Sequence, residues 1–256
     1  MRLLLLSNST NPGGGYLAHA APRIRRFLGP DARRVAFVPY AAVTVSYDAY
    51  AARVAEALGA LGHEIVPVHR AADPAAVVRA ADAVAVGGGN TFRLLARLYE
   101  TGLLEVIRDR VGAGAPYLGW SAGSNVACPT IRTTNDMPIV EPPSFRALGL
   151  VPFQINPHYT DARLPNHQGE TRDERLAEFV ALNPEMTVIG LPEGAMLLVE
   201  GGRVELLSGR PARIFRAGRP PLEQPPGPIE LHPAVAGWAS GGAWLGEAPV
   251  TSGEGT

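Results

Sequence analysis

The most informative absence from this chain is that of lysine. All 23 basic residues among its 256 are arginine, so no ε-amino group exists to form a Schiff base, anchor pyridoxal phosphate or contact phosphates in a P-loop. The 24 acidic residues bring the formal net charge to −1. Because non-specific nucleic-acid binding needs an excess of positive charge, we expect no nucleic-acid partner.

Cysteine and long apolar runs are also scarce. Cys128 is the only cysteine, which excludes an intrachain disulfide and a multi-cysteine zinc site. We expect its side chain to be a small buried hydrophobe. The N-terminal apolar run, Leu3–Leu6, is too short for a signal peptide, and no stretch approaches the roughly 18 apolar residues of a membrane span. These absences favour a cytoplasmic protein with no membrane segment, and we expect neither a metal nor a cofactor.

What the chain has is an alternation of short apolar runs with longer stretches of helical spacing. This pattern indicates an α/β fold, a three-layer sandwich in which helices cover both faces of a mostly parallel central sheet. Strands are predicted at residues 3–6, 34–39, 64–68, 83–86, 117–119, 187–191, 196–199 and 204–207. Helices are predicted at residues 17–28, 47–61, 74–81, 91–99, 103–111 and 172–182.

No linker or internal repeat divides this pattern, so we expect a single α/β domain over residues 1–218. Residues 219–256 are rich in proline and glycine and have no sustained period. We interpret them as a C-terminal tail that lies on the surface or is partly disordered.

The strongest local motif is Gly-Trp-Ser-Ala-Gly at residues 119–123. A G-x-S-x-G pattern between a strand and a helix is typical of a nucleophile elbow, which would lift the Ser121 hydroxyl out of the sheet. The flanking glycines suit such an elbow because its tight turn leaves no room for a Cβ. The same pattern occurs by chance in ordinary turns, so its surroundings decide the reading. Trp120 is expected to pack beneath the elbow.

A glycine-rich loop, Gly-Gly-Gly-Asn at residues 87–90, also joins a predicted strand to a predicted helix. Its Gly88 or Gly89 N–H could form an oxyanion hole together with the N–H of Ala122. Asn90 is a candidate for substrate binding. Nucleotide binding is the weaker interpretation, because the loop lacks both the G-x-G-x-x-G spacing and a lysine.

A serine nucleophile needs a base and a carboxylate that orients it. Of the six histidines, His158 is placed best, at the end of a short apolar run, and His167 lies in a polar loop nearby as a candidate substrate ligand. Two carboxylates compete for the imidazole: Glu193, directly after a predicted strand, and Asp136. Spacing alone does not choose between them, although the chain order of α/β-hydrolases would favour Asp136.

Two arginines stand at an unusual place. Thr171 and Glu174 form a capping box that is predicted to start a helix, and Arg172 and Arg175 fall in its first turn. The helix dipole disfavours cations there by a few tenths to about 1 kcal/mol. Bidentate binding of a substrate carboxylate would account for that cost. The simpler alternative is an exposed pair between Arg175 and Glu178.

Six runs, ordered along the chain, together resemble the peptidase E family of serine peptidases, the α-aspartyl dipeptidases. They are SNST at 7–10, GGGNTF at 87–92, GWSAG at 119–123, RTTNDMP at 132–138, NPH at 156–158 and LPEG at 191–194. The resemblance covers roughly Met1 to Gly218. It implies a fold like that of the class I glutamine amidotransferases, with Ser121 in place of their nucleophilic cysteine.

The resemblance also implies a catalytic triad of Ser121, His158 and Glu193, and an oxyanion hole formed by Gly89 or Gly88 with Ala122. Asp136 would then bind substrate, for instance its free α-amine. The expected activity is that of a serine exopeptidase, which hydrolyses dipeptides and related amides with an N-terminal aspartate through an aspartyl-enzyme.

Other functions stay open at this point. They are a related serine hydrolase with another substrate, either cyanophycinase-like or an esterase, a non-catalytic binding module on the same fold, and a nucleotide-binding regulator. The sequence leaves the oligomeric state open, as monomer or homodimer.

Overall fold

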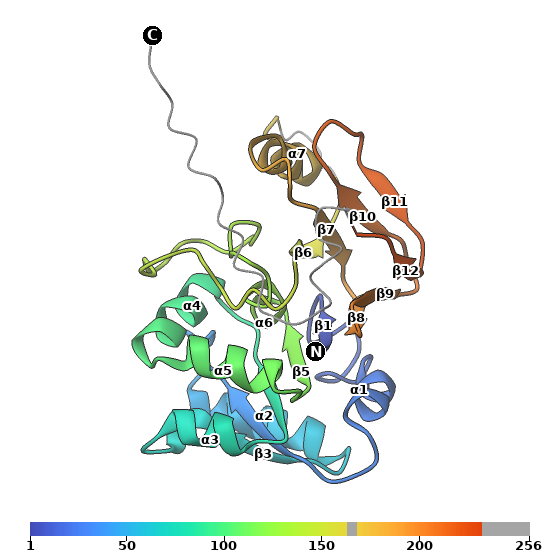
Figure 1. Ribbon diagram of the computed structural model, residues 1–256. Helices are drawn as coiled ribbons and strands as arrows, with labels where there is room; N and C mark the ends of the chain where they lie inside the picture. The colour runs from blue at the N-terminus through green and yellow to red at the C-terminus, as the bar shows by residue number, and fades with distance from the viewer. Residues whose placement is uncertain (163–167, 232–256) are drawn as a thin grey trace.

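The central sheet of this computed structural model, which describes residues 1–162 and 168–231, has eight strands in the order β12-β9-β8-β1-β5-β4-β2-β3 (Figure 1). Five of them pair in parallel: β1 (Arg2–Leu6), β2 (Arg34–Val38), β3 (Glu64–Pro67), β4 (Ala83–Val86) and β5 (Tyr117–Trp120). Three more continue the sheet in antiparallel fashion: β8 (Met196–Glu200), β9 (Arg203–Leu207) and β12 (Gly227–Ile229). The parallel strands are almost unbroken apolar runs because both of their faces are covered.

Helices cover the two faces of this sheet. One face carries α1 (Ala21–Leu28) and α2 (Tyr47–Gly59), and the other carries α3 (Pro74–Ala80), α4 (Thr91–Glu100), α5 (Leu103–Gly112) and α6 (Ala122–Asn125). A short 3-10 turn, Val68–Arg70, follows β3. Successive residues of β1 serve opposite faces, as the period of a strand requires: Leu4 and Leu6 pack with α1 and α2, whereas Leu3 and Leu5 pack with α3 to α6.

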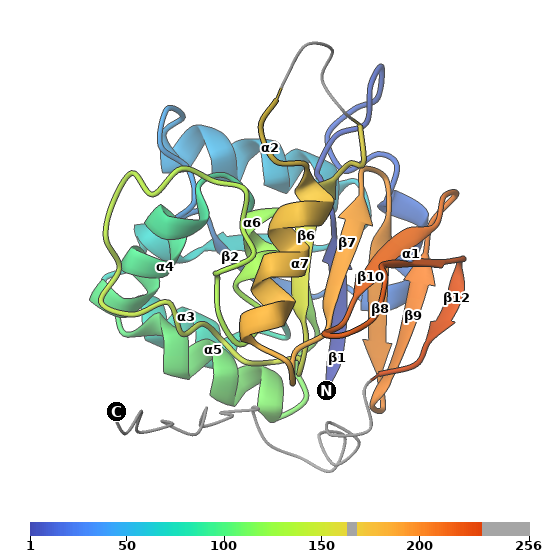
Figure 2. The ribbon, with the colours of Figure 1, turned by 90° about the horizontal axis from the view of Figure 1, so that it is seen from above.

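A second, smaller sheet stands beside the first and was not foreseen in the sequence. Its order is β11-β10-β7-β6, with β6 (Gln154–Tyr159), β7 (Val188–Pro192), β10 (Ala212–Phe215) and β11 (Leu222–Gln224). Helix α7 (Arg172–Leu182) lies on this sheet (Figure 2), where Leu176 and Val180 pack against Val188 and Phe215.

The three-layer α/β fold predicted from the sequence is confirmed, with some differences in its elements. Helix α1 begins at Ala21 rather than at residue 17, because Leu17 has a positive φ of 56° that no helix continues. Strands β11 and β12 lie in the segment that had been interpreted as tail. They are three residues long, too short to show a period, and they exist because β10 and β9 offer them backbone partners. Residues 232–256 lie outside the described part, and the domain boundary stays a prediction.

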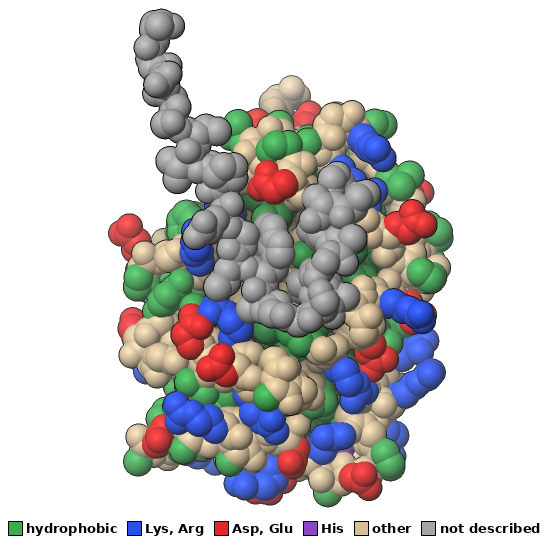
Figure 3. Space-filling view, in the orientation of Figure 1, with side chains coloured by type: hydrophobic (Ala, Val, Ile, Leu, Met, Phe, Trp, Pro, Cys, Tyr) green, Lys and Arg blue, Asp and Glu red, His purple; other side chains and the backbone are tan. Residues whose placement is uncertain are grey.

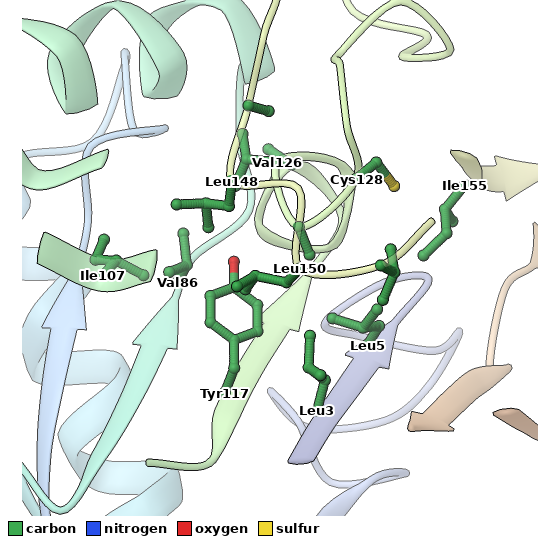
Figure 4. Close-up of a cluster of buried hydrophobic side chains, with 14 of the residues drawn as sticks. Leu3, Leu5, Val86, Ile107, Tyr117, Val126, Cys128, Leu148, Leu150 and Ile155 are labelled. Atoms are coloured by element: carbon green, nitrogen blue, oxygen red, sulfur yellow. The ribbon is translucent and has the colours of Figure 1, made fainter. Parts of the chain in front are cut away.

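The core cluster that supports the site includes Cys128 (Figure 4). Its thiol is fully buried among apolar side chains such as Leu5, Val126 and Ile155, and burial raises the thiol pKa well above its ordinary value. The expectation that Cys128 acts as a small buried hydrophobe is therefore confirmed.

The surface carries charges of both signs. Basic and acidic side chains are interspersed over the face shown in Figure 3. On α1, the arginines at 23, 25 and 26 are exposed beside the buried Ile24, as expected of a solvated helix face. In the described residues, no helix combines the length and the apolar character that crossing a membrane would need.

Candidate active site

Ser121 occupies a sharp turn between β5 and α6. Its φ of 53° and ψ of −114° lie outside the regions that residues with a Cβ prefer, so the surrounding backbone must hold it there. The flanking glycines are what allows the turn. A Cβ on Gly119 would lie 2.6 Å from the Gly123 carbonyl oxygen, and one on Gly123 would lie 2.0 Å from that of Val86. The turn therefore has the geometry of a nucleophile elbow.

The imidazole of His158 bridges the serine and a carboxylate. Its Nε2 is 3.0 Å from Ser121 Oγ, and its Nδ1 is 2.9 Å from Glu193 Oε1. His158 has a positive φ of 53°, and the pairing of β6 with β7 shifts register around it. Such an irregularity redirects a side chain. The His158 and Glu193 side chains are 42% and 48% exposed, so the site is open to solvent.

The loop after β1 fixes the backbone of both residues. The buried Ser7 hydroxyl accepts a hydrogen bond from the His158 N–H at 2.9 Å and donates one to the Leu191 carbonyl at 2.8 Å. Asn8 Oδ1 accepts one from the N–H of Gly194 at 2.8 Å. The sequence motif at residues 7–10 had carried the family resemblance without an assigned role, and these contacts show what its first two residues do.

Asp136 lies elsewhere. Its Oδ2 accepts hydrogen bonds from Thr91 N at 2.7 Å, Thr91 Oγ1 at 2.6 Å and Thr134 Oγ1 at 3.2 Å. The carboxylate thus sits at the N-terminus of α4, where the helix dipole favours a negative charge. In residues 1–162 and 168–231, none of its hydrogen bonds goes to His158, and none involves Oδ1. The carboxylate that the structure places against the imidazole is Glu193.

The glycine-rich loop passes directly beside the nucleophile. A Cβ on Gly88 would lie 3.0 Å from Ser121 Cβ. Gly89 has a φ of 137°, and a Cβ there would lie 2.3 Å from the Ala41 carbonyl oxygen, so only glycine fits. Within the described part of the chain, the N–H groups of Gly89 and Ala122 donate to no protein atom. The N–H of Gly88 likewise has no acceptor among the described residues, so the oxyanion hole, with Gly88 or Gly89 as one donor, stays a prediction.

Asn90 uses both ends of its amide within the protein. Its Oδ1 accepts from Arg93 N at 3.0 Å as the N-cap of α4, and its Nδ2 donates to the Met137 carbonyl at 2.8 Å. Asn90 therefore holds the loop around residue 137 to the helix.

A cavity of about 630 Å³ opens in front of Ser121 and His158. Its wall combines apolar side chains with a few polar ones. The lining includes Tyr16, Val43, Val45, Tyr50, Arg53 and Ile139. Among the described residues, Arg53 is the only arginine in this lining. It was not predicted from the sequence, because a single arginine on a helix forms no motif. Such a mixed wall suits a small substrate with an apolar part and charged groups.

Arg172 does not line this cavity. The guanidinium is half-buried, and its Nη1 donates to Asn135 Oδ1 and to Asn156 Oδ1, the latter at 3.2 Å. Asn135 in turn donates to the Pro157 carbonyl at 2.6 Å, next to His158. Burial, followed by repulsion from Arg175, lowers the pKa of Arg172. No carboxylate of the described residues forms an ion pair with it.

The neighbouring predictions have mixed outcomes. The capping box between Thr171 and Glu174 is confirmed. Arg175 is exposed, as the simpler alternative had it, but its ion pair is with Glu170 at 3.5 Å rather than with Glu178, because Glu170, just before the helix, lies within reach of the guanidinium. Trp120 is 1% exposed beneath the elbow, as expected. His167 lies outside the described residues. No metal-binding cluster of three His, Cys, Asp or Glu side chains occurs in the described residues.

The site has a serine on a strand-to-helix elbow, and this serine is hydrogen-bonded to a histidine that contacts a carboxylate. This arrangement is typical of the α/β serine hydrolases. The model of Peptidase family S51 matches residues 3–207. The chain is 52% identical to the peptidase E of Nostoc sp. over 88% of its own length and 93% of that protein. It is 56% identical to the peptidase E of Streptomyces coelicolor, with 87% and 90% covered. The chain therefore belongs to peptidase family S51 and is a serine-type peptidase.

Solved structures agree on the fold. A protein from Listeria monocytogenes EGD-e, assigned to peptidase E, superimposes with a TM-score of 0.61 at 23% identity, covering 81% of this chain and 98% of that one. A peptidase from an acI-B1 actinobacterium superimposes with a TM-score of 0.62 at 17% identity, covering 87% and 96%.

Proposed function

We propose that this protein is a serine exopeptidase that hydrolyses dipeptides and related amides with an N-terminal aspartate. The observation that carries the proposal is the chain of hydrogen bonds from Ser121 through His158 to Glu193 at the mouth of the cavity. The motifs shared with the α-aspartyl dipeptidases and the relatives named peptidase E support the substrate class.

In the proposed reaction, His158 Nε2 takes the proton of Ser121 as Oγ attacks the carbonyl carbon of the aspartyl residue. The N–H groups of Gly89 and Ala122 stabilise the negative charge that develops on the carbonyl oxygen. His158 then gives its proton to the leaving amine as the C–N bond breaks, and an aspartyl ester of Ser121 remains. A water molecule, deprotonated by His158, hydrolyses this ester. Glu193 orients the imidazole and stabilises its positive charge throughout.

Substrate recognition requires a cation for the aspartate side chain and an anion for the free α-amine. Arg172 suits the first role because a half-buried guanidinium gains from a carboxylate partner. Asp136 suits the second role because it lines the cavity and its Oδ1 has no hydrogen bond within the described residues. The apolar wall formed by Val43, Val45 and Ile139 would then accommodate the side chain that follows aspartate.

The activity is tested with Asp-Leu, Glu-Leu, Asn-Leu, Ala-Leu and N-acetyl-Asp-Leu. We expect cleavage of Asp-Leu alone. Asn-Leu and Ala-Leu lack the side-chain carboxylate, N-acetyl-Asp-Leu lacks the charged amine, and Glu-Leu carries its carboxylate one methylene further from the scissile carbonyl. Ser121→Ala should lower kcat by about 10⁴- to 10⁶-fold, whereas Ser144→Ala, in a loop outside the cavity lining, should not. Cleavage by Ser121→Ala at the wild-type rate would refute the mechanism. Cleavage of larger aspartyl polymers or esters alone would move the protein to another substrate class.

The role of Arg172 is tested against that of Arg53, the arginine in the cavity wall. We expect Arg172→Gln to reduce the preference for Asp-Leu over Asn-Leu by about 10-fold or more, the equivalent of one charged hydrogen bond. Arg53→Gln and Arg175→Gln should leave this ratio within about two-fold. If Arg53→Gln alone abolishes the preference, the aspartate side chain lies in the cavity and Arg172 has another role.

The proposal includes a cytoplasmic location, where small dipeptides are available as substrates. Cell fractionation would test it, with activity expected in the cytoplasmic fraction. Size-exclusion chromatography with light scattering would distinguish a monomer from a homodimer.

A further inference from the structure

The tyrosine that connects the glycine-rich loop to the elbow has no part in the mechanism above. Tyr50 projects from α2 and is 8% exposed. Its hydroxyl oxygen lies 3.1 Å from the Gly88 carbonyl oxygen, 2.9 Å from Trp120 Nε1 and 3.2 Å from the hydroxyl of Tyr16. Trp120 directly precedes the nucleophile, so one hydroxyl group contacts both the glycine-rich loop and the residue before Ser121.

The direction of each hydrogen bond follows from the chemistry of the partners. An indole N–H can only donate and a carbonyl oxygen can only accept. Trp120 therefore donates to the Tyr50 oxygen, and Tyr50 gives its single proton to the carbonyl of Gly88. Tyr16 must then donate to Tyr50, which fills the donor site and both acceptor sites of the phenol. Burial raises the pKa of Tyr50, so this hydroxyl keeps its proton at neutral pH.

The carbonyl that Tyr50 contacts belongs to the same peptide unit as the Gly89 N–H. The two groups of a planar trans peptide point in opposite directions, so a donor held against the carbonyl also fixes where the N–H points. The same donor polarises the peptide and strengthens the N–H as a donor. The loop is shaped for this contact: a Cβ on Gly87 would lie 2.5 Å from the Tyr50 hydroxyl oxygen, so the first glycine of the run makes room for it.

We propose that Tyr50 is a positioning residue of the oxyanion hole, which orients and polarises the Gly88–Gly89 peptide so that the Gly89 N–H meets the developing oxyanion. Tyr50 touches no reacting atom. The inference rests on the proposed function only for the roles of Ser121 and Gly89, and it requires no particular substrate. Because the charge on the carbonyl oxygen develops in the transition state, the effect falls on kcat rather than on KM.

The test is Tyr50→Phe, which removes the hydroxyl and keeps the ring. Losing an entire oxyanion-hole donor lowers kcat by about 10²- to 10³-fold, and a donor that is present but misdirected should cost less, about 10-fold. We expect KM for Asp-Leu to stay within about two-fold. The affinity for an aspartyl aldehyde, which adds to Ser121 as a tetrahedral analogue, should fall by the same factor as kcat. Tyr40→Phe, at a tyrosine that is also buried but lies outside the cavity lining, should change none of these quantities.

An unchanged kcat in Tyr50→Phe, or a loss of kcat without a matching loss of aldehyde affinity, would overturn the proposal. An equal loss in Tyr40→Phe would also overturn it, because the effect would then be one of stability. If Tyr50→Phe does not fold, 3-fluorotyrosine at position 50 keeps the shape and supplies a stronger hydrogen-bond donor. We expect it to raise the aldehyde affinity, and no change would contradict the proposal.

A failure of the proposed substrate class is distinguishable from a failure of this inference. A phosphonate that reacts with active serines places an oxygen in the oxyanion hole without any dipeptide recognition. If no dipeptide is cleaved, Ser121 should still react with the phosphonate, and about 10-fold more slowly in Tyr50→Phe. Equal rates of labelling in the two proteins would refute the role of Tyr50 whatever the natural substrate.

Discussion

Replacing Glu193 by glutamine tests which carboxylate serves the triad. The substitution keeps the shape of the side chain and removes its charge, 2.9 Å from the imidazole. Coulomb attraction at that distance is worth about 1.4 kcal/mol in water and about 6 kcal/mol at an effective dielectric constant of 20. The two side chains are 42% and 48% exposed. The stabilisation lost with the charge of Glu193 should therefore fall in the lower part of this range, about 1.5–3 kcal/mol.

At about 1.4 kcal/mol for each factor of ten, the structure predicts that Glu193→Gln lowers kcat on Asp-Leu by about 10- to 150-fold. This is much less than the loss of about 10⁴-fold caused by the corresponding change at the buried aspartate of a trypsin-like triad. The smaller loss follows from solvent exposure, because water can partly stabilise the imidazolium that forms in the reaction.

The assay is steady-state hydrolysis of Asp-Leu by Glu193→Gln and by Asp136→Asn, with thermal unfolding of both proteins. Asp136→Asn weakens the cap of α4, which should cost about 0.5–2 kcal/mol of stability and lower Tm by a few degrees. If Asp136 holds the substrate amine, this variant also raises KM. The reasoning is refuted if Asp136→Asn loses more kcat than Glu193→Gln, because the triad carboxylate would then be Asp136.

Three further outcomes follow from the same geometry. Gly123→Ala should abolish activity and lower Tm strongly, because its Cβ would lie 2.0 Å from the Val86 carbonyl oxygen. Gly112→Ala, in a helix with open space around it, should leave Tm unchanged or raise it. Thermal melts followed by circular dichroism compare the two variants. Cys128 should react with a thiol reagent only in denaturant, since it is buried and its thiol pKa is raised; labelling of the native protein at the rate of free cysteine would contradict its burial. Burial, with smaller contributions from Arg33 and Arg25, lowers the pKa of His63, so the unfolded chain binds more protons and the free energy of unfolding should fall as the pH drops below about 6.5. In urea unfolding between about pH 5 and pH 8, the free energy of unfolding of His63→Leu should change less with pH than that of the wild-type protein. An identical pH dependence in the two proteins would refute the role given to His63.

Much of the parallel sheet could be predicted from local pattern. The runs at β1, β2 and β4 are apolar on both faces because helices cover both sides of the sheet. An unbroken apolar run of that length is typical of a buried parallel strand. Helix α7 begins and ends where its capping box and its spacing predict. The second sheet could not be predicted in the same way. Strand β6 contains Asn156, Pro157 and His158, which are poor strand formers, and it is held in place by β7.

The sequence by itself predicted an elbow at Ser121 that needs its flanking glycines, because these features depend on neighbours within a few residues. It also determined the fold class and, through its motifs, the resemblance to a family. Spacing left Glu193 and Asp136 open as partners of His158, and only the family resemblance favoured Glu193; the tertiary structure places Glu193 against the imidazole. The contact of Tyr50 with the loop at Gly88 is visible only in the tertiary structure. His158 and Glu193 are 35 residues apart and Tyr50 and Gly88 are 38 apart. Contacts at such separations arise from the packing of whole elements, which leaves no periodic trace along a single chain.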